Sequence, residues 1–539
     1  MKNAKRILTL ALALMMVLSL AITASADETT YTITINNDKD GHTYQAYQIF
    51  TGTLSNASSN DDAEDTNATL SNVQWGANAN KTGAATEADL TDLTIEKAIS
   101  YVNFATDPVG TSTDAGTTYV ISGLKPGYYL VKDKDDTLNG TNDAYTSYIV
   151  EVVENSTVSP KSSVPFVEKK VDDKNDSNTS EDAVVWQDSA DYDIGDAVPF
   201  KLTATLASNV TAYAGAYKIV FHDTLDAGLT YNGDATIYVG DNLVYDQKDE
   251  TKQPAGVSVS HENGKLTITI ADAKADSIGA ANSSVITVYY TAELNENAIH
   301  YETGNVNKVY LEYANNPNWV APPDDGNPDT PPEEPDTGKT PEDKVIVFTY
   351  KAAVDKVHKN PDYDPDADDN TEGTDDQEFV PLVGASFTLY KKLSAQPAEG
   401  SGVDYVTETA EGITTYWEVK GTVDGTNAST FTWQGLDDGD YKLVETVTPA
   451  GYNTIEPIFF SITASHTQEG NDPRLITLSG DGMTVEEDGT LTTQVENKAG
   501  VTLPETGGMG TTLFYVIGGL LVAAAIVLLV TKKRMASAE

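Results

Sequence analysis

The sequence predicts an all-β fold, with three tandem immunoglobulin-like β-sandwich domains between a leader segment and a membrane anchor. Short runs rich in Thr, Val, Ile and Tyr, bounded by Gly, Asn and Asp, recur at residues 31–35, 119–122, 147–153 and 265–270. Such runs at turn-separated spacing are typical of β-sandwiches. The 539 residues also exceed what one hydrophobic core holds. One helical stretch is expected near residues 90–104.

Both ends of the chain have the composition of membrane-directed segments. Residues 1–26 begin with basic residues, continue with an apolar run and end on Ala24-Ser25-Ala26, which is the pattern of a cleaved signal peptide. Residues 513–530 are apolar and uncharged, and a helix of that length rising about 1.5 Å per residue crosses a bilayer. The basic residues 532–534 favour the cytoplasmic side. The body of the protein is therefore expected outside the cell.

Composition narrows the function further. The chain has no cysteine, so disulfides, thiol nucleophiles and cysteine-ligated metals are excluded and any covalent cross-link must use other side chains. Acidic residues number 82 against 34 basic ones, for a net charge of −48. Such a surface repels nucleic acid and anionic lipid. No metalloprotease, serine-hydrolase or phosphate-binding motif occurs, and no cofactor is expected, so the protein is not expected to be an enzyme.

Two composition changes suggest domain boundaries. Pro160 and Pro165 flank a serine-rich segment, and a proline-rich acidic stretch covers residues 321–341. Proline-rich stretches of this kind cannot form a packed core. After the signal peptide, the predicted modules are residues 27–162, 163–340 and 341–500, followed by a C-terminal segment at 501–539.

The C-terminal segment contains Leu503-Pro504-Glu505-Thr506-Gly507 ahead of the apolar span and the basic tail. This order resembles the LPXTG cell-wall sorting signal of Gram-positive surface proteins. The resemblance implies that a sortase cysteine attacks the Thr506 carbonyl and that an amine resolves the acyl-enzyme. The product is then a secreted protein anchored to the cell wall.

The product depends on which amine accepts the acyl group: peptidoglycan gives a single anchored molecule, and a lysine of another copy gives a fibre. Val158-Ser159-Pro160-Lys161 resembles the pilin motif of polymerising pilins, although Ser159 stands where the family has an aromatic residue. By that resemblance Lys161 of one subunit joins Thr506 of the next, since joining through different surfaces gives an open filament. The other interpretation is a solvated linker lysine, with peptidoglycan as the acceptor.

The third module resembles the Cna B-type domains that form intramolecular isopeptide bonds. Residues 441–452 are similar to the E-box of that family, and residues 381–390 to its second strand. The resemblance implies Lys356 as nucleophile, Asn497 as electrophile and Glu445 as the proton-handling acid. The chemistry is plausible physically because burial lowers a lysine pKa and raises a carboxyl pKa, while folding supplies proximity. The alternative is a buried ion pair.

The second module has a similar pattern, and the first lacks part of it. Strand alternation favours Lys169 as the inward lysine of residues 166–171, and similarity to Asp-dependent domains implies Asp223 as the acid and Asn307 as the electrophile, with Asn305 as the fallback. In the first module residues 123–133 echo residues 435–445, so that Asp133 stands at the position of Glu445. Its first strand has no lysine, so no bond is expected there.

Alternating aspartates give a weak calcium candidate. They lie in one Pro-containing loop without the glycine and glutamate of an EF-hand, and a solvated acidic loop is the preferred interpretation; they are Asp362, Asp364, Asp366 and Asp368.

Taken together, these motifs are similar to those of SpaA/SpaD-like backbone pilins. The resemblance implies a major subunit of a covalent surface pilus, or fimbria, that supports adhesion. Its expected partners are identical subunits, a pilus-specific class C sortase, housekeeping sortase with peptidoglycan, and ancillary pilins. The alternative is an ancillary pilin or a monomeric adhesin. The motifs do not indicate a host receptor.

Overall fold

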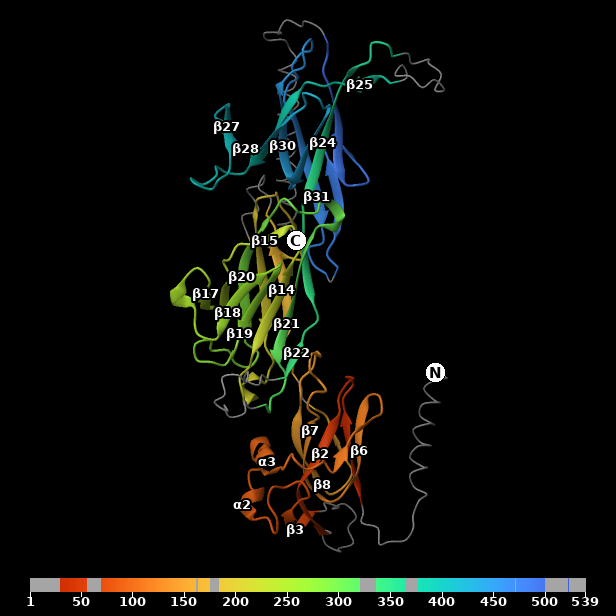
Figure 1. The fold of residues 1–539 in the computed structure, drawn as a ribbon, viewed down its shortest axis with the longest axis vertical. Helices are drawn as coiled ribbons and strands as arrows, with labels where there is room; N and C mark the ends of the chain where they lie inside the picture. The colour runs from red at the N-terminus through yellow and green to blue at the C-terminus, as the bar shows by residue number, and fades with distance from the viewer. Residues whose placement is uncertain are drawn as a thin grey trace, which may run out of the picture.

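The computed structural model is an elongated molecule in which three β-sandwiches are stacked end to end along the long axis (Figure 1). The structure describes a set of segments that covers all three sandwiches: residues 30–55, 69–160, 163–174, 184–319, 336–363, 377–470, 472–499 and Val522. The described part is nearly all β, which confirms the predicted fold class. Within these segments no helix is long and apolar enough to span a membrane.

The N-terminal module packs two sheets against each other. One sheet has the order β5-β6-β1-β9 and the other β3-β2-β7-β8, with β4 pairing to β2. The predicted helical stretch is present as two short helices beside the second sheet. The elements are β1 Tyr31–Asn36, β2 Tyr44–Ser55, β3 Thr69–Trp75, α2 Glu87–Leu90, α3 Ile95–Tyr101, β4 Gly110–Thr111, β5 Thr113–Asp114, β6 Thr118–Leu124, β7 Gly127–Asp133, β8 Ser147–Val152 and β9 Ser156–Val158.

The middle module is larger and has two seven-stranded sheets. One follows β11-β10-β13-β20-β16-β17, with β15 pairing to β20. The other follows β12-β23-β21-β14-β19-β18, with β22 pairing to β21. In β13 and β20 every second side chain is buried, and these side chains point into the core between the two sheets. Its strands are β10 Phe166–Asp172, β11 Trp186–Gln187, β12 Ser189–Asp191, β13 Ala197–Thr205, β14 Ile219–Leu225, β15 Leu229–Tyr231, β16 Thr236–Val239, β17 Asn242–Asp246, β18 Val257–Glu262, β19 Lys265–Ile270, β20 Val285–Leu294, β21 Asn305–Ala314, β22 Thr337–Lys339 and β23 Asp343–Phe348.

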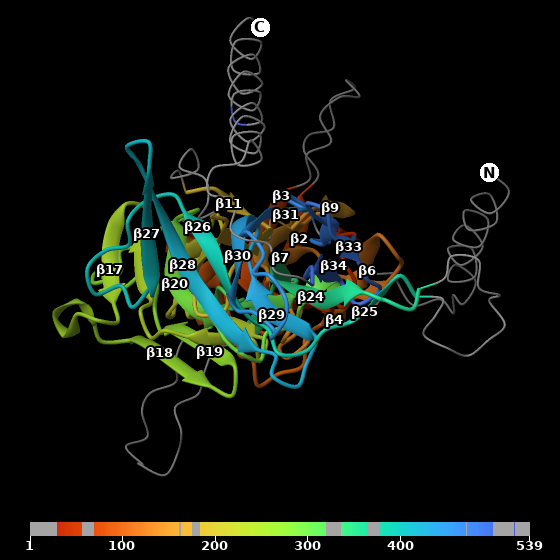
Figure 2. The same ribbon diagram turned by 90° about the horizontal axis from the view of Figure 1, so that it is seen from above.

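The C-terminal module repeats the topology of the N-terminal one. Its first strand pairs antiparallel with β29 and parallel with the last strand, as β1 does with β6 and β9. The hairpin β27–β28 stands away from the body in both views (Figures 1 and 2). The strands are β24 Tyr350–Lys359, β25 Phe379–Pro381, β26 Ser386–Leu393, β27 Tyr405–Ala410, β28 Ile413–Asp424, β29 Thr430–Leu436, β30 Gly439–Val447, β31 Ile458–His466, β32 Leu475–Gly480, β33 Thr484–Val485 and β34 Thr490–Glu496.

The predicted boundary at residues 340 and 341 is corrected by the pairing of β22 and β23. Both strands lie beside β21 in a sheet of the middle module. The residues that flank the proline-rich stretch are close together, since the Asn315 N–H donates to the Asp336 carbonyl at 3.1 Å. The stretch therefore leaves and returns to one module, and the chain crosses to the next at Thr349.

Strand β23 belongs to the packing of two modules at once. Val345 and Val347 lie in the core of the middle module, whereas Ile346 and Phe348 pack with the core of the C-terminal module. This arrangement follows from alternation, because successive side chains of a strand point to opposite faces. The two modules therefore share one strand.

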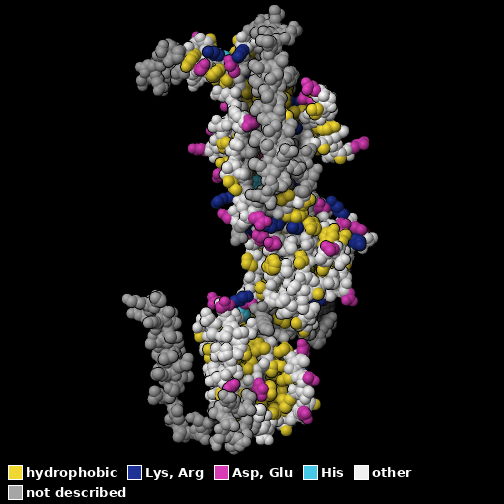
Figure 3. Space-filling model, turned by 180° about the vertical axis from the view of Figure 1, so that it is seen from behind, with side chains coloured by type: hydrophobic (Ala, Val, Ile, Leu, Met, Phe, Trp, Pro, Cys, Tyr) yellow, Lys and Arg dark blue, Asp and Glu magenta, His cyan; other side chains and the backbone are white. Residues whose placement is uncertain are grey.

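The surface agrees with the acidic composition. Acidic side chains are scattered over all three modules, and hydrophobic ones gather on the N-terminal module, on the side of its helices (Figure 3). Several predicted features lie outside the described residues, namely the signal peptide, Lys161, the pentapeptide 503–507 and, apart from Val522, the apolar span.

Candidate cross-link sites

The three residues predicted in the C-terminal module meet in its core. Lys356 Nζ donates a hydrogen bond to Asn497 Oδ1, and Asn497 Nδ2 donates to Glu445 Oε1 at 3.0 Å. The lysine nitrogen lies 3.5 Å from the same Glu445 oxygen. The side chains of Lys356 and Glu445 are fully buried.

The strands explain how this group assembles. In β24 the side chains of Val354 and Lys356 share one inward face. Strand β34 runs parallel to β24 with Val495 opposite Lys356, so Asn497 follows just beyond the lysine. Glu445 comes from β30 of the opposite sheet. The site thus brings together Lys356 of β24 and Asn497 after β34, and the Glu445 carboxyl group of the opposite sheet contacts both.

Burial lowers the pKa of Lys356, and the nearby Glu445 carboxylate only partly offsets that effect. A larger fraction of the amine is therefore neutral than in water, which is the form that attacks a carbonyl carbon. Glu445 Oε2 also accepts from Thr448 Oγ1 and the Ile455 N–H, each at 3.1 Å. These bonds fix the carboxyl group, leaving Oε1 directed at the asparagine amide.

The middle module brings Lys169, Asp223 and Asn307 together through a residue that sequence reasoning missed. Lys169 Nζ lies 2.5 Å from Asp223 Oδ2 and 2.9 Å from the hydroxyl of Tyr290. The Tyr290 hydroxyl donates to Asp223 Oδ2 at 2.8 Å and accepts from Asn307 Nδ2 at 2.7 Å. Tyr290 therefore contacts all three predicted groups.

Two buried oxygen atoms beside Tyr290 have no hydrogen-bond partner among the described residues: Asp223 Oδ1 and Asn307 Oδ1. Orphaned polar atoms are costly in a core. Burial lowers the pKa of Lys169 and raises that of Asp223. The arrangement therefore favours a neutral amine beside a protonated acid, with an asparagine carbonyl oxygen available to be polarised.

The fallback residue Asn305 is engaged elsewhere. Its Oδ1 accepts from the Ile299 N–H at 2.8 Å, and its Nδ2 donates to the carbonyls of Ile299 and Val347, each at 3.1 Å. Asn305 therefore organises a loop and the neighbouring β23, and geometry favours Asn307 as the electrophile.

The N-terminal module uses the same acid position differently. Asp133 Oδ1 lies 2.8 Å from His42 Nδ1, and Asp133 Oδ2 accepts from the N–H and the hydroxyl of Thr146. His42 Nε2 lies 3.0 Å from Asp143 Oδ2. Ile35 pairs with Tyr119 as Val354 pairs with Phe431, so Asn37 takes the place of Lys356.

Of the calcium candidate, the structure describes one residue. Asp362 is exposed in a turn, where its N–H donates to Asn360 Oδ1 at 3.1 Å. The other three aspartates, Asp364, Asp366 and Asp368, lie outside the described residues.

Comparisons with known proteins agree with this architecture. Residues 371–472 match the family described as the SpaA prealbumin-like fold domain, and residues 495–537 match the LPXTG cell wall anchor motif. The trypsin-resistant surface T6 protein of Streptococcus pyogenes serotype M6 is 26% identical over 422 residues, which are 70% of each chain.

Solved structures include the T6 backbone pilin of serotype M6 Streptococcus pyogenes, described as a modular three-domain structure. It has a TM-score of 0.53 at 19% identity, with 89% of this chain and 100% of that one covered. The major pilin SpaD of Corynebacterium diphtheriae has a TM-score of 0.43 at 17% identity, with 89% and 100% covered.

The stacked sandwiches and the matched anchor motif define a cell-wall-anchored surface protein. Among such proteins the chain resembles the sortase-assembled backbone pilins of the SpaA/SpaD type, and the matches confirm the resemblance stated from the sequence. The relatives are structural pilins rather than enzymes, in agreement with the interpretation of the sequence.

Proposed function

We propose that the protein is the shaft subunit of a covalent surface pilus and that two of its three modules are closed by Lys–Asn isopeptide bonds. The observation that carries this proposal is the buried contact of Lys356 with Asn497 under Glu445. A cysteine-free chain gains from it a covalent connection between the first and last strands of a sandwich.

The reaction needs no co-reactant. Lys356 Nζ attacks Asn497 Cγ, the C–N bond to the asparagine amide nitrogen breaks, and that nitrogen leaves as ammonia after proton transfer through Glu445. In the middle module Lys169 attacks Asn307 in the same way, with Asp223 as the acid. Tyr290 positions these groups, since its hydroxyl contacts all three of them.

The bonds suit a tensile role. Tension that enters at β24 passes through the new amide to Asn497 and bypasses the strands between them. Without the bond the load falls on backbone hydrogen bonds worth about 0.5–1.5 kcal/mol each. The Lys169–Asn307 bond protects residues 170–306 in the same manner.

Polymerisation is assigned to Lys161 and Thr506. Lys161 lies between Pro160, after the last strand of the N-terminal module, and Ser163, before the first strand of the middle module. The sorting motif follows the C-terminal module at the far end of the stack. A link between these two positions uses different surfaces and builds an open, head-to-tail fibre. A pilus-specific class C sortase would make it, and housekeeping sortase would attach it to peptidoglycan beside ancillary pilins.

Intact mass spectrometry of the chain from residue 27 to 506 tests the cross-links. The expected mass is lower than the sequence mass by two ammonia molecules, one for each bond. A mass equal to that of the sequence would refute both bonds.

The shaft assignment is tested separately in the native host. Lys161→Ala should abolish the ladder of high-mass polymers and leave single, wall-anchored chains. Lys39→Ala, which changes an exposed lysine of the same module, is the matched control. A persistent ladder in Lys161→Ala would exclude this lysine as the acceptor.

A further inference from the structure

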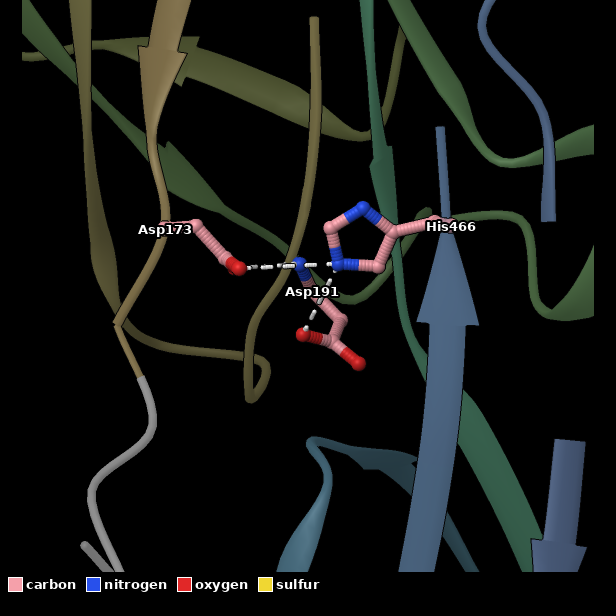
Figure 4. Close-up of side chains that lie close together, drawn as sticks. All are labelled: Asp173, Asp191 and His466. Carbon is pink, nitrogen blue, oxygen red and sulfur yellow. Dashed lines mark hydrogen bonds and ion pairs between the residues drawn. The ribbon is translucent and has the colours of Figure 1, made fainter. Parts of the chain in front are cut away.

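A pocket at the junction of the middle and C-terminal modules contains a histidine and two carboxylates that the proposed function does not use. Asp173 follows β10 and Asp191 ends β12 in the middle module, whereas His466 ends β31 of the C-terminal module. They line a cavity of about 220 Å³ whose wall also includes Asp438 and Gln468. Figure 4 shows the three side chains converging on one point between the modules.

The hydrogen bonds of Ser189 indicate which nitrogen of His466 carries the proton. The Ser189 hydroxyl donates to the carbonyl oxygen of Thr467. Its oxygen is then left to accept from His466 Nδ1, which lies 2.9 Å away. In the neutral form with its proton on Nδ1, the imidazole presents the Nε2 lone pair to the two carboxylates.

The distances at Nε2 are too long for good hydrogen bonds and are compatible with ligands that share one cation. Nε2 lies 3.6 Å from Asp173 Oδ2 and 3.7 Å from Asp191 Oδ1, beyond the usual hydrogen-bond range. Neighbouring ligands of a tetrahedral cation with bonds of about 2.0–2.2 Å are separated by roughly 3.3–3.6 Å. The His466 side chain is only 8% exposed, so a buried nitrogen faces two carboxylates at ion-pair distance.

Outer contacts hold the carboxylates in place. Gln187 Nε2 donates to Asp173 Oδ2 at 2.7 Å, and the Tyr350 hydroxyl donates to Asp191 Oδ2 at 2.7 Å. Together with Ser189 on the imidazole, each of the three side chains has a partner that orients it, as in metal sites.

The backbone brings the two modules into register at this point. The Asp188 N–H donates to the Gln468 carbonyl at 2.9 Å, and the Gly470 N–H donates to Asp188 Oδ2 at 2.7 Å. The segment after β31 is thereby fastened to the segment before β12. The three ligand atoms, which lie within 4.8 Å of one another, are therefore arranged before any ion arrives.

We propose that Asp173, Asp191 and His466 bind a divalent transition-metal cation that joins the middle and C-terminal modules. One imidazole nitrogen with two carboxylate oxygens suits zinc, whereas calcium and magnesium prefer oxygen ligands alone. Water, or the nearby Asp438 carboxylate, completes the coordination. The ion ties together two modules that the isopeptide bonds close only individually.

Titration calorimetry with zinc chloride in chelator-treated buffer tests the site, using the chain from residue 27 to 506. One zinc ion per chain is expected, and calcium chloride at equal concentration should not compete. His466→Gln should weaken zinc binding at least tenfold, and Asp173→Asn should do the same. The control His261→Gln changes an exposed histidine of the middle module and should bind as the wild type does.

Intact mass and circular dichroism establish that each variant is folded before binding is compared. Zinc that produces no heat with the wild type would overturn the proposal. Equal affinity for the wild type and both site variants would do so too, because the ion would then bind elsewhere. Competition by calcium would overturn the assignment of a nitrogen ligand.

Discussion

The N-terminal and C-terminal modules share a topology and differ in what meets their buried acid. In the C-terminal module Glu445 faces a lysine and an asparagine, whereas in the N-terminal module Asp133 faces His42. The matched registers place Asn37, which hydrogen-bonds Tyr44, at the position of Lys356. The same sandwich therefore supports a covalent bond or an ion pair.

In both modules the fold places a buried acid at the same position. The residue on or next to the first strand, Lys356 in one module and Asn37 in the other, then determines whether that acid can take part in an isopeptide bond. A lysine can become permanently linked, but a histidine between two carboxylates remains a reversible, proton-dependent contact. The N-terminal module, which Lys161, the proposed acceptor, follows in the sequence, is the one without a predicted bond.

The largest expected effect comes from removing the acid of the C-terminal module. Glu445→Gln should restore the mass of one ammonia, because Asn497 loses the group that handles its protons. The folded module should lose on the order of 5 kcal/mol of stability, as expected for opening a closed loop of more than 100 residues. Mass spectrometry and urea denaturation measure both effects.

The comparison supplies the control for that experiment. Asp133→Asn changes the equivalent acid of the N-terminal module and should leave the mass unchanged. Loss of an ammonia deficit in this variant would mean that the first module also carries a bond.

The ion pair of the N-terminal module should make its stability depend on pH. Burial lowers the pKa of His42, but hydrogen bonds and charges from Asp133 and Asp143 outweigh that effect and raise it to about 9. The unfolded value is about 6.5. The stabilisation is therefore complete below pH 6.5 and is lost as the pH rises towards 9, on the order of 3 kcal/mol at most.

Denaturation of this module followed between pH 6 and pH 10 measures that loss. His42→Gln should be less stable at pH 6 and should show a flatter pH profile. If the wild-type profile is already flat across this interval, the charged histidine contributes nothing.

A smaller effect is expected at Tyr290 in the middle module. Tyr290→Phe should slow bond formation on the order of 100-fold, the scale of rate lost when reacting groups are misplaced, without unfolding the module. Mass spectra taken at intervals after refolding measure the loss of ammonia over time. Bond formation in the C-terminal module of the same chain is the internal reference rate. If the ratio of the two rates is the same in the variant as in the wild type, Tyr290 has a packing role only.

The smallest effect separates the two candidate asparagines. Asn305→Ala should keep both ammonia losses, because its amide is engaged with Ile299 and Val347. Asn307→Ala should show one loss only. The reverse result would exchange their roles.

Sequence reasoning found the residues of the C-terminal site because each lies in a contiguous motif with a fixed position on its strand. It missed Tyr290, although the alternation of β20 places that side chain on the inward face. What the sequence did not show is which residues of other strands face it across the core, because these come from β10, β14 and β21, which are far apart in the chain. His42 was also missed, since it lies in the loop between β1 and β2, outside any strand.

The module boundary was misjudged for a different reason. Proline and acidic residues report that a segment cannot form a core, but they do not report where the chain goes afterwards. Here it returns to β21 as β22, and β23 then adds to the same sheet. Long-range strand pairing of this kind leaves no local signal in composition.

Because the side chains of β23 belong to two hydrophobic cores, the middle and C-terminal modules should move together as one rigid unit. The N-terminal sandwich shares no strand with its neighbour among the described residues, and hydrogen bonds join the loop before β8 to the residues around Asn315. A fibre of such subunits would then bend at one joint per subunit, next to the lysine proposed to link it to its neighbour. Compliance and covalent continuity would thus be located at the same place in the filament.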